Sequence, residues 1–306
     1  MEYTLIGYTG FVGSNIANRE EITQKYNSKN INNAFDNKHE VVIYSGIKAE
    51  KYLANTEPEK DMQVIENAIN NIKKLNFDKL VLISTVDIYK TPLFVNEETI
   101  INTEDLHPYG LNRYILEKWV SENVKNYHII RLPGLFGKNI KKNFIFDMIN
   151  IVPFMLKENL YKDILADYPA LNQYYIKDNL FYKLKNLTNE EKRHLKSFFK
   201  EYHFNALHFT DSRNNYQFYN LHNLWNDIQT ALNNNIKLLN IATEPINTAE
   251  LYKYVTGKDF VNITTNKPVT YNMESIYAKK YYNHDKYLYI KDNILKEIKT
   301  FIMEHD

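Results

Sequence analysis

Three glycines fall within seven residues of "TLIGYTGFVG", directly after an apolar run. In this G-x-x-G-x-x-G spacing, Gly7 permits a tight turn and Gly10 lets the backbone approach a pyrophosphate. Gly13 lets the following helix pack closely on the strand. The chain has only 8 glycines, so their concentration at a strand-to-helix junction is unusual. We therefore predict a dinucleotide-binding turn, with cofactor contacts from Gly7, Thr9, Gly10, Phe11, Val12 and Gly13.

A second chemical pattern is a tyrosine followed by a cation on the same helical face, Tyr109 and Arg113 in "HPYGLNRYILEKW". A phenol with a pKa of about 10 is a poor base at neutral pH. A neighbouring cation stabilises the phenolate and lowers that pKa. Arginine keeps the charge, but it does not readily pass a proton onward. Arg113 therefore fits cofactor binding better than it fits a proton relay.

The elements that must position these residues alternate along the first half of the chain. Four compact β-branched runs, typical of buried parallel strands, are "YTLIGY", "EVVIYSG", "KLVLISTV" and "YHIIRLPG". Helical patterns lie between them at 11–22, 59–75 and 107–124. Alternation of strand and helix predicts an α/β fold with a doubly wound parallel sheet, the Rossmann fold.

The composition changes after Phe136. Residues 151–215 are rich in aromatics and lysine and show no strand alternation. A helix is expected at 187–202, where Thr188 and Glu191 fit a capping box. A strand–helix–strand pattern returns before 246–306, which reads as mainly helical. We predict a nucleotide-binding core of 1–150 plus 216–245, and a smaller, mostly helical substrate-binding lobe of 151–215 plus 246–306.

Composition narrows the function classes. Lys and Arg number 38 against 37 acidic residues, and the net charge of +1 favours neither nucleic acid nor an anionic membrane as a partner. The chain contains no cysteine, which excludes disulfides and thiolate chemistry and fits a reducing compartment. We found no secretory signal and no continuous apolar stretch of the roughly 20 residues that a membrane helix needs. A cytoplasmic protein is expected.

Five stretches together resemble the extended short-chain dehydrogenases/reductases, also called the NAD-dependent epimerase/dehydratase family. The filling of the glycine turn is one of them, and "LISTVDIY", with Thr85 four residues before Tyr89, is another. "HPYGLNRYILEKW" is similar to the family's Y-G-x-x-K-x-x-x-E helix, with Tyr109 and Glu117 at the matching positions. The remaining pieces are "RLPGLFG" and the late "YQFYNLHNLWNDIQTAL" with "LLNIATEP". Position 113 departs from the pattern, because the family has lysine there.

The resemblance implies roles for the catalytic candidates. Tyr109 would exchange a proton with the substrate, Thr85 would orient the substrate oxygen, and Arg113 would hold the ribose and tune Tyr109. Val86 occupies the position of the first acid that family dehydratases carry, which argues against complete dehydratase chemistry. Asp87 could remove a proton beside a carbonyl, as in keto-sugar epimerases, or it could simply cap a turn.

Cofactor choice depends on the end of the expected second strand, where NAD-specific sites place an acid. The stretch "QKYNSKNINN" has none. Ser28 and Lys29 could contact a 2′-phosphate, which favours NADP over NAD, or they could form a plain polar loop. Ser45 and Gly46 match family positions along the cofactor, and Pro133 falls near the position that usually contacts the carboxamide.

These observations predict an NAD(P)-dependent reductase or epimerase of a nucleotide-activated keto-sugar. A catalytically silent NAD(P)-binding or sensing module is the main alternative, and a reductase of a non-sugar carbonyl is another. By analogy with the family, the helix near Tyr109 could form a homodimer. His203, His208 and Asp211 fit no common metal-ligand spacing, so no metal is expected.

Overall fold

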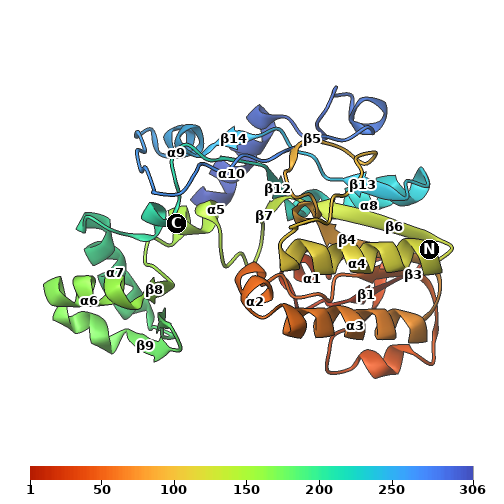
Figure 1. Cartoon of the computed structure of the whole chain (residues 1–306), viewed down its shortest axis with the longest axis horizontal. Helices are drawn as coiled ribbons and strands as arrows, with labels where there is room; N and C mark the ends of the chain where they lie inside the picture. Colours follow the sequence, from red (N-terminus) through yellow and green to blue (C-terminus); the bar gives the residue numbers. More distant parts are fainter. Residues whose placement is uncertain (306) are drawn as a thin grey trace.

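Six parallel strands form the central sheet in the computed structural model, which describes residues 1–305 (Figure 1). Every adjacent pair is parallel, which confirms the predicted doubly wound α/β fold. In spatial order the strands are β13 (Leu238–Asn240), β6 (Tyr127–Leu132), β4 (Asn76–Thr85), β3 (Lys38–Tyr44), β1 (Tyr3–Ile6) and β2 (Ile22–Tyr26). Because the strands are parallel, their carboxyl ends meet at one edge.

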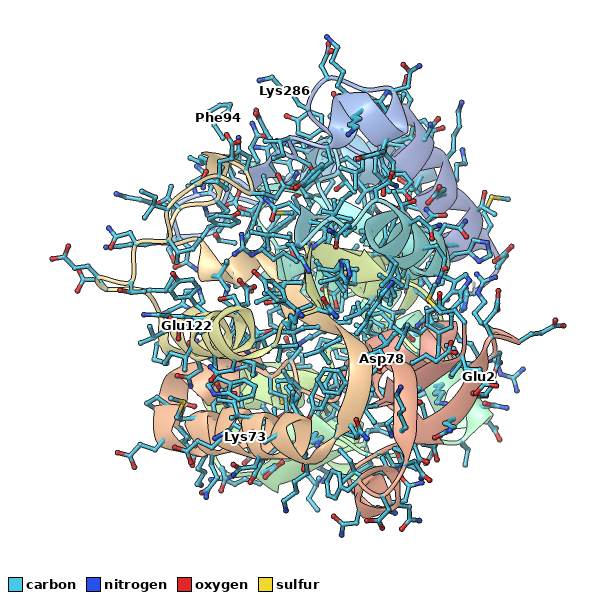
Figure 2. All side chains as sticks on the ribbon, turned by 90° about the vertical axis from the view of Figure 1, so that its right-hand side faces the viewer. Glu2, Lys73, Asp78, Phe94, Glu122 and Lys286 are labelled. Atoms are coloured by element: carbon cyan, nitrogen blue, oxygen red, sulfur yellow. The ribbon has the colours of Figure 1, made fainter. Side chains whose placement is uncertain are left out.

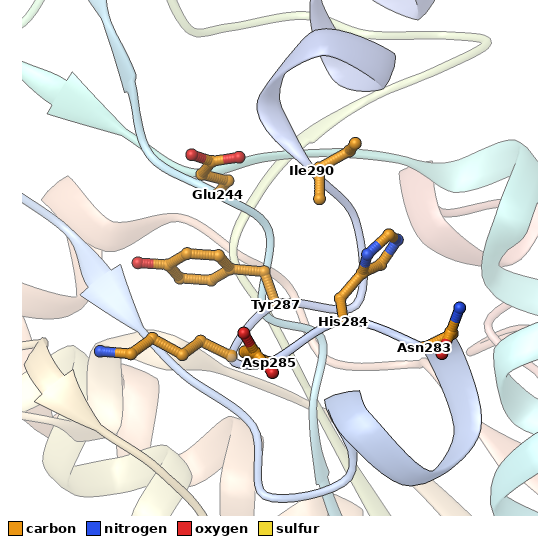
Figure 3. Close-up of a pocket in the computed structure, with 7 residues that line it drawn as sticks. Glu244, Asn283, His284, Asp285, Tyr287 and Ile290 are labelled. Carbon is orange, nitrogen blue, oxygen red and sulfur yellow. The ribbon is translucent and has the colours of Figure 1, made fainter.

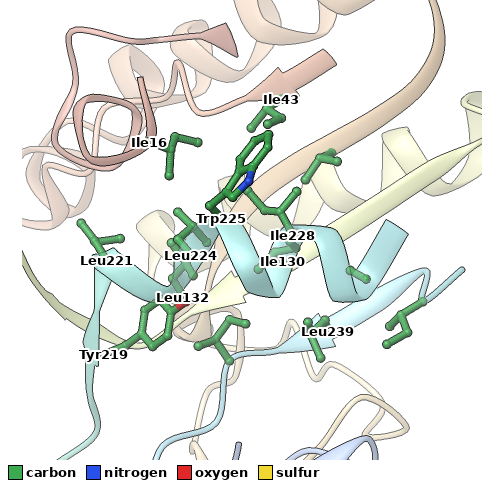
Figure 4. Packing of buried hydrophobic residues seen from close by; sticks show 14 of the residues in the cluster. Ile16, Ile43, Ile130, Leu132, Tyr219, Leu221, Leu224, Trp225, Ile228 and Leu239 are labelled. Carbon is green, nitrogen blue, oxygen red and sulfur yellow. The ribbon is translucent and has the colours of Figure 1, made fainter. Parts of the chain in front are cut away.

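Helices cover both faces of this sheet. Successive side chains along a strand point to opposite faces, and here the side chains on both faces are apolar and need to be covered. Helices α1 (Phe11–Ile16) and α8 (Leu224–Asn233) share one apolar cluster with β1, β3, β4 and β6. Figure 4 shows Trp225 and Ile228 of α8 against Ile43 and Ile130. The opposite face packs on α3 (Pro58–Lys74) and α4 (Pro108–Asn123). Strands buried on both faces carry continuous apolar runs, as this sequence does.

The outer surfaces of these helices are polar. Lys73 of α3 and Glu122 of α4, labelled in Figure 2, are both exposed. Among residues 1–305, no helix is both long enough and apolar enough to cross a bilayer.

A buried ion pair fixes α4 to the sheet. Glu117 of α4 accepts three hydrogen bonds from Arg131 of β6, at 2.7 to 3.2 Å, and one from Ser84 of β4. Arg131 also donates to the phenol oxygen of Tyr89 (2.7 Å). A buried charge pair needs such complete hydrogen bonding to offset its desolvation. The motif residue Glu117 therefore sets the position of the helix that carries Tyr109.

Two sequence expectations for the helices, at 11–22 and at 246–306, need correction. Residues 11–22 do not form one helix: α1 ends at Ile16, a turn follows, and Ile22 already begins β2. Segment 246–306 is not mainly helical: within its described part, 246–305, the α-helices are α9 (Thr248–Thr256) and α10 (Lys291–Met303), with a π-helical turn at Ala278–Tyr282. Much of 257–290 is irregular and packs its tyrosines against the first apolar cluster.

Short strand pairs join this C-terminal segment to the core. β5 (Leu93–Val95) pairs with β15 (Asn272–Met273), and β11 (Asn215–Tyr216) pairs with β14 (Ile246–Asn247). A further pair, β7 (Gly134–Phe136) with β12 (Phe218–Asn220), lies within the predicted core. α5 (Phe144–Ile149), α9 and α10 share a further apolar cluster with β7 and β12. The C-terminal segment thus packs on elements of the predicted core.

Residues 151–204 contribute a separate apolar cluster, and Figure 1 shows this lobe beside the main body. It contains a three-stranded antiparallel sheet, which the sequence analysis missed, in the order β8 (Met155–Lys157), β10 (Phe181–Leu184), β9 (Tyr175–Asp178). Its helices are α6 (Glu158–Asp167) and α7 (Asn189–Glu201). The Thr188–Glu191 capping box predicted for α7 is confirmed. The division into core and substrate lobe remains a prediction.

A tyrosine cage surrounds a buried carboxylate on α8. Asp227 accepts hydrogen bonds from the phenols of Tyr219, Tyr282 (2.8 Å) and Tyr289 (2.9 Å). These partners come from β12 and from the C-terminal segment, so the cage ties both to α8. Burial raises the pKa of Asp227 to about 6, although the three phenol hydrogen bonds act in the opposite direction.

We predict that Asp227→Asn changes the pH dependence of stability. The folded protein binds the Asp227 proton more tightly than the unfolded chain does. The contribution of this group to stability is therefore greatest below about pH 4. Stability falls as pH rises through about 6, by about 3 kcal/mol in total at 1.36 kcal/mol per pKa unit. Asparagine does not ionise. Urea unfolding should therefore show the variant gaining about 3 kcal/mol relative to wild type between pH 4 and pH 7, and a constant difference would contradict this.

Candidate functional site

The glycine turn lies at the carboxyl edge of the sheet, directly after β1. Gly7 has φ +92°, and a Cβ there would lie 2.7 Å from the Gly46 Cα atom. A Cβ on Gly13 would collide with the Gly7 carbonyl oxygen and lie 2.9 Å from Ser45 Oγ. Gly10 has freer surroundings and is exposed. The first and third glycines thus close the turn against β3, while the second is open to a ligand.

The loop after β3 completes this part of the site. Ser45 donates hydrogen bonds from both its N–H (3.0 Å) and its hydroxyl (2.9 Å) to the carbonyl of Ile6, the last residue of β1. The structure thus brings Ser45 and Gly46 against the turn, as their predicted role requires. Of the other predicted turn residues, Thr9 is exposed, while Phe11 and Val12 are half-buried at the start of α1.

The first turn of α4 packs against the end of β4. His107 caps the helix, its Nδ1 accepting from Gly110 N (3.0 Å), and Pro108 occupies the first helical position. A Cβ on Gly110 would collide with the Asp87 carbonyl oxygen. Glycine therefore lets α4 approach the 3-10 turn Val86–Ile88 closely.

This close approach brings Thr85 and Tyr109 together. The Tyr109 phenol is buried, and burial raises its pKa. The charge of Arg113 lowers this pKa, that of Asp87 raises it, and Lys51 and the nearby Thr85 hydroxyl lower it. The net result is a phenol held in its protonated form beside a hydroxyl.

Arg113 is buried between α4 and α3. Its guanidinium stacks on the Tyr109 ring at 4.1 Å from the centroid, pairs with Asp61, and donates to the Lys48 carbonyl at 2.7 Å. The stacking fits the expected tuning of Tyr109. Two of the guanidinium nitrogens, however, already bind protein oxygens, which leaves fewer donors for a ribose than the sequence suggested.

Asp87 is held from two sides. Its Oδ1 accepts from Lys51 Nζ at 2.7 Å and from the Tyr271 phenol at 3.3 Å, and its backbone N–H donates to Thr85 Oγ1 at 3.2 Å. Tyr271 comes from the C-terminal segment, and burial raises its pKa, with the Asp87 charge adding to the effect. The carboxylate thus lies beside the catalytic candidates, and it is engaged in an ion pair.

The sequence analysis missed the segment that covers this centre. Residues 48–55, which lead into α2 (Lys51–Thr56), contact nearly every catalytic candidate. The contacts are Arg113 Nη2 to the Lys48 carbonyl, Lys142 Nζ to the Ala49 carbonyl, Lys51 Nζ to Asp87, and Tyr109 N to Asn55 Oδ1 (3.0 Å). "KAEKYLAN" carries no motif. His107 had a signal that could have been used, because it precedes a proline at a helix start.

The other cofactor candidates lie at the same edge. Ser28 and Lys29 are exposed in the turn after β2, which the Asn27 and Asn30 side chains stabilise through backbone N–H bonds of 2.9 and 2.7 Å. This turn carries no acidic residue. Pro133 is buried directly after β6.

Two further features lie elsewhere. A surface cavity of about 350 Å³ is lined by Glu244, Asn283, His284, Asp285, Lys286, Tyr287 and Ile290 and by none of the predicted catalytic residues (Figure 3). Asp211 pairs with Arg213 (2.7 Å) and accepts from Thr264. Within residues 1–305, we found no cluster of three or more His, Cys, Asp or Glu suited to a metal ion.

No protein-family profile and no curated protein matches the chain. Solved structures match its fold over nearly the whole length. dTDP-4-dehydrorhamnose reductase from Yersinia enterocolitica is 15% identical, with a TM-score of 0.63 and 100% of both chains covered. RMD from Pseudomonas aeruginosa, in complex with NADPH, is 12% identical, with a TM-score of 0.65 and coverage of 100% and 99%. UDP-glucose 4-epimerase from Thermotoga maritima, with UDP-glucose, is 13% identical, with a TM-score of 0.57 and coverage of 99% and 98%. The chain has the fold of the extended short-chain dehydrogenases/reductases.

We predict that Gly110→Ala destabilises the protein by about 1–3 kcal/mol, because its Cβ must push α4 away from Asp87. Gly46→Ala is the control. Its Cβ would make only ordinary contacts, the nearest at 3.4 Å, and its effect should stay below about 1 kcal/mol. Urea unfolding without ligand measures both values, and equal stabilities would refute the close packing.

Proposed function

We propose that this protein is an NAD(P)-dependent oxidoreductase or epimerase that acts on a nucleotide-activated keto-sugar. The observation that carries the proposal is the close packing of the first turn of α4, which carries Tyr109, on the turn that begins at Thr85. Both lie at the edge of the sheet that also holds the glycine turn. The full-length likeness to nucleotide-sugar reductases and epimerases supports the substrate class.

The residues at the sheet edge fit a nicotinamide dinucleotide. At Gly7 and Gly13 a Cβ would collide with the opposing backbone, so these glycines close the turn, while the exposed Gly10 leaves its outer side open to a pyrophosphate. Gly7, Gly10 and Gly13 would hold the pyrophosphate, with Ser45 and Gly46 alongside it. When bound, the nicotinamide would supply or accept the hydride.

Tyr109 would move the proton that accompanies this hydride. In the reducing direction, the Tyr109 O–H bond breaks as the substrate carbonyl oxygen gains a proton, and the phenolate left behind recovers a proton from water. Thr85 would orient that oxygen by a hydrogen bond. Burial keeps the phenol protonated, which suits a proton donor. Reduction of a keto-sugar is therefore the favoured direction, and the absence of an acid at Val86 disfavours a dehydratase.

Asp87 would have a more restricted role than that of a free base. Its carboxylate is paired with Lys51 and hydrogen-bonded to Tyr271. Proton abstraction beside a carbonyl, as in an epimerase, would require it to leave one of these partners.

A second candidate function, a silent NAD(P)-binding module, rests on Arg113. Position 113 holds lysine in the family that the sequence resembles. Two nitrogens of the Arg113 guanidinium already bind Asp61 and the Lys48 carbonyl. Such a module would bind NAD(P)H without oxidising it in the presence of any keto-sugar nucleotide. Dimerisation through α4, in either case, remains a prediction.

We predict that Tyr109→Phe lowers kcat/KM for a 4-keto-sugar nucleotide by about 10²- to 10⁴-fold, the usual contribution of a positioned acid. The dissociation constant for NADPH should change little. Tyr114→Phe, on the same helix, serves as the matched control. The absorbance of the reduced nicotinamide ring follows turnover. Binding of NADPH without turnover in the wild type would favour the silent module.

We also predict a preference for NADP, because the turn after β2 offers Lys29 and no carboxylate. Lys29→Ala should weaken NADPH binding about 10-fold, equivalent to about 1.4 kcal/mol, and leave NADH binding unchanged. Competition titrations by nicotinamide fluorescence measure both constants. Equal losses for the two cofactors, or none, would remove Lys29 from the recognition of a 2′-phosphate.

A further inference from the structure

The environment of Arg113 leaves a gap in the proposed centre. Its charge is paired with Asp61, whose side chain is also buried and accepts from Asn112 at 2.9 Å. The guanidinium is itself buried, and an arginine stays protonated at working pH. Arg113 can therefore act on Tyr109 as a fixed charge, but it cannot exchange a proton between the phenol and solvent.

Lys51 lies where such a charge would act. Its Nζ is 2.7 Å from Asp87 Oδ1, and Asp87 in turn packs on the first turn of α4 through its carbonyl oxygen at Gly110. The Lys51 side chain is 41% exposed, so its ammonium contacts both the carboxylate and solvent. An ammonium tied to a buried turn but open to water can exchange protons with the medium.

The groups that face Lys51 come from several elements. Asp87 follows β4, and Tyr109 and His107 belong to the start of α4. Tyr271, from the C-terminal segment, donates to the same Asp87 oxygen that Lys51 binds. Lys142, before α5, and Tyr216 of β11 are further titratable groups whose pKa the Lys51 charge lowers. The further charges around these groups are Glu50, Arg113 and Asp211.

The effects of Lys51 on its neighbours agree in direction. Burial lowers the pKa of His107 and of Lys142, and the Lys51 charge lowers both further. Burial raises the pKa of Tyr109, and Lys51 opposes this rise. Lys51 therefore acts on the charge state of the whole centre.

We propose that Lys51 is a positioning residue of this centre: it holds the Asp87 carboxylate beside α4 and supplies the solvent-accessible ammonium that Arg113 does not provide. Resting on the proposed function, this role is to stabilise the Tyr109 phenolate after proton transfer.

The test reads the phenol directly. A difluorotyrosine is incorporated at position 109 of the full chain, because fluorination lowers the phenol pKa into a range where the protein stays folded. A single ¹⁹F signal then reports ionisation of this group as pH is raised, without substrate or cofactor. The comparison covers Lys51→Met, Lys51→Arg and Lys48→Met. Lys48 lies three residues away with an exposed side chain that, within residues 1–305, makes no ion pair, so it is the matched control.

We expect Lys51→Met to raise the pKa at position 109 by about one unit, the lower range for removal of a nearby opposite charge. Lys51→Arg should restore most of the difference, and Lys48→Met should shift the pKa far less. The basic limb of the kcat/KM profile should move in the same direction as the ¹⁹F signal. An unchanged pKa in folded Lys51→Met would overturn the proposal.

The two proposals fail separately. A wild-type protein without turnover on any keto-sugar nucleotide, together with the ¹⁹F shift, would refute the enzymatic function and keep the role of Lys51 in the charge state of Tyr109. Turnover with no ¹⁹F shift would refute the role of Lys51 and keep the enzyme.

Discussion

The close contact between α4 and the turn after β4 is the constraint on which the candidate site depends. Gly110 has no side chain, so the first turn of α4 lies directly on the Asp87 carbonyl. The buried Glu117–Arg131 pair holds the same helix to β6 two turns later. These two attachments fix α4, and with it Tyr109, beside Thr85 at the end of the neighbouring strand. A hydroxyl from a strand end and a phenol from a helix thus form one polar centre, with the charges of Arg113, Asp87 and Lys51 around it.

Burial has opposite effects on the groups of this centre. It raises the pKa of Tyr109 and lowers the pKa of His107 and Lys142, so each group tends toward its neutral form. The charges of Arg113 and Lys51 oppose the rise in the Tyr109 pKa, and the charge of Asp87 adds to it. Lys51 adds to the lowering of the pKa of His107 and Lys142. A site arranged in this way keeps a proton on the phenol until a substrate takes it. This is the physical reason that a reductive role fits the structure well.

Much of the fold could be predicted from sequence, because buried parallel strands and glycine turns have strong local signals. The runs at β1, β3, β4 and β6 were recognised for this reason, and the capping box of α7 is a local pattern too. β2 was expected only through its end at "QKYNSKNINN", because "ITQKY" is an edge strand with polar residues and has no continuous apolar run. The small sheet of 155–184 was hidden by strands of only three or four residues rich in lysine and tyrosine. Thr85, Asp87 and Tyr109 could be grouped from the sequence through the family resemblance of "LISTVDIY" and "HPYGLNRYILEKW". Lys51 and the Asp61 partner of Arg113 could not, because their approach depends on how α2 and α3 pack in three dimensions.

The central claim is that Thr85, Tyr109 and the glycine turn converge on one nicotinamide dinucleotide. A crystal structure of the protein grown with NADPH tests it most directly. The account predicts density for the pyrophosphate against Gly7, Gly10 and Gly13, and for the nicotinamide ring beside the Tyr109 phenol. A dinucleotide bound elsewhere, or a Tyr109 phenol turned away from Thr85 and from the edge of the sheet, would contradict it.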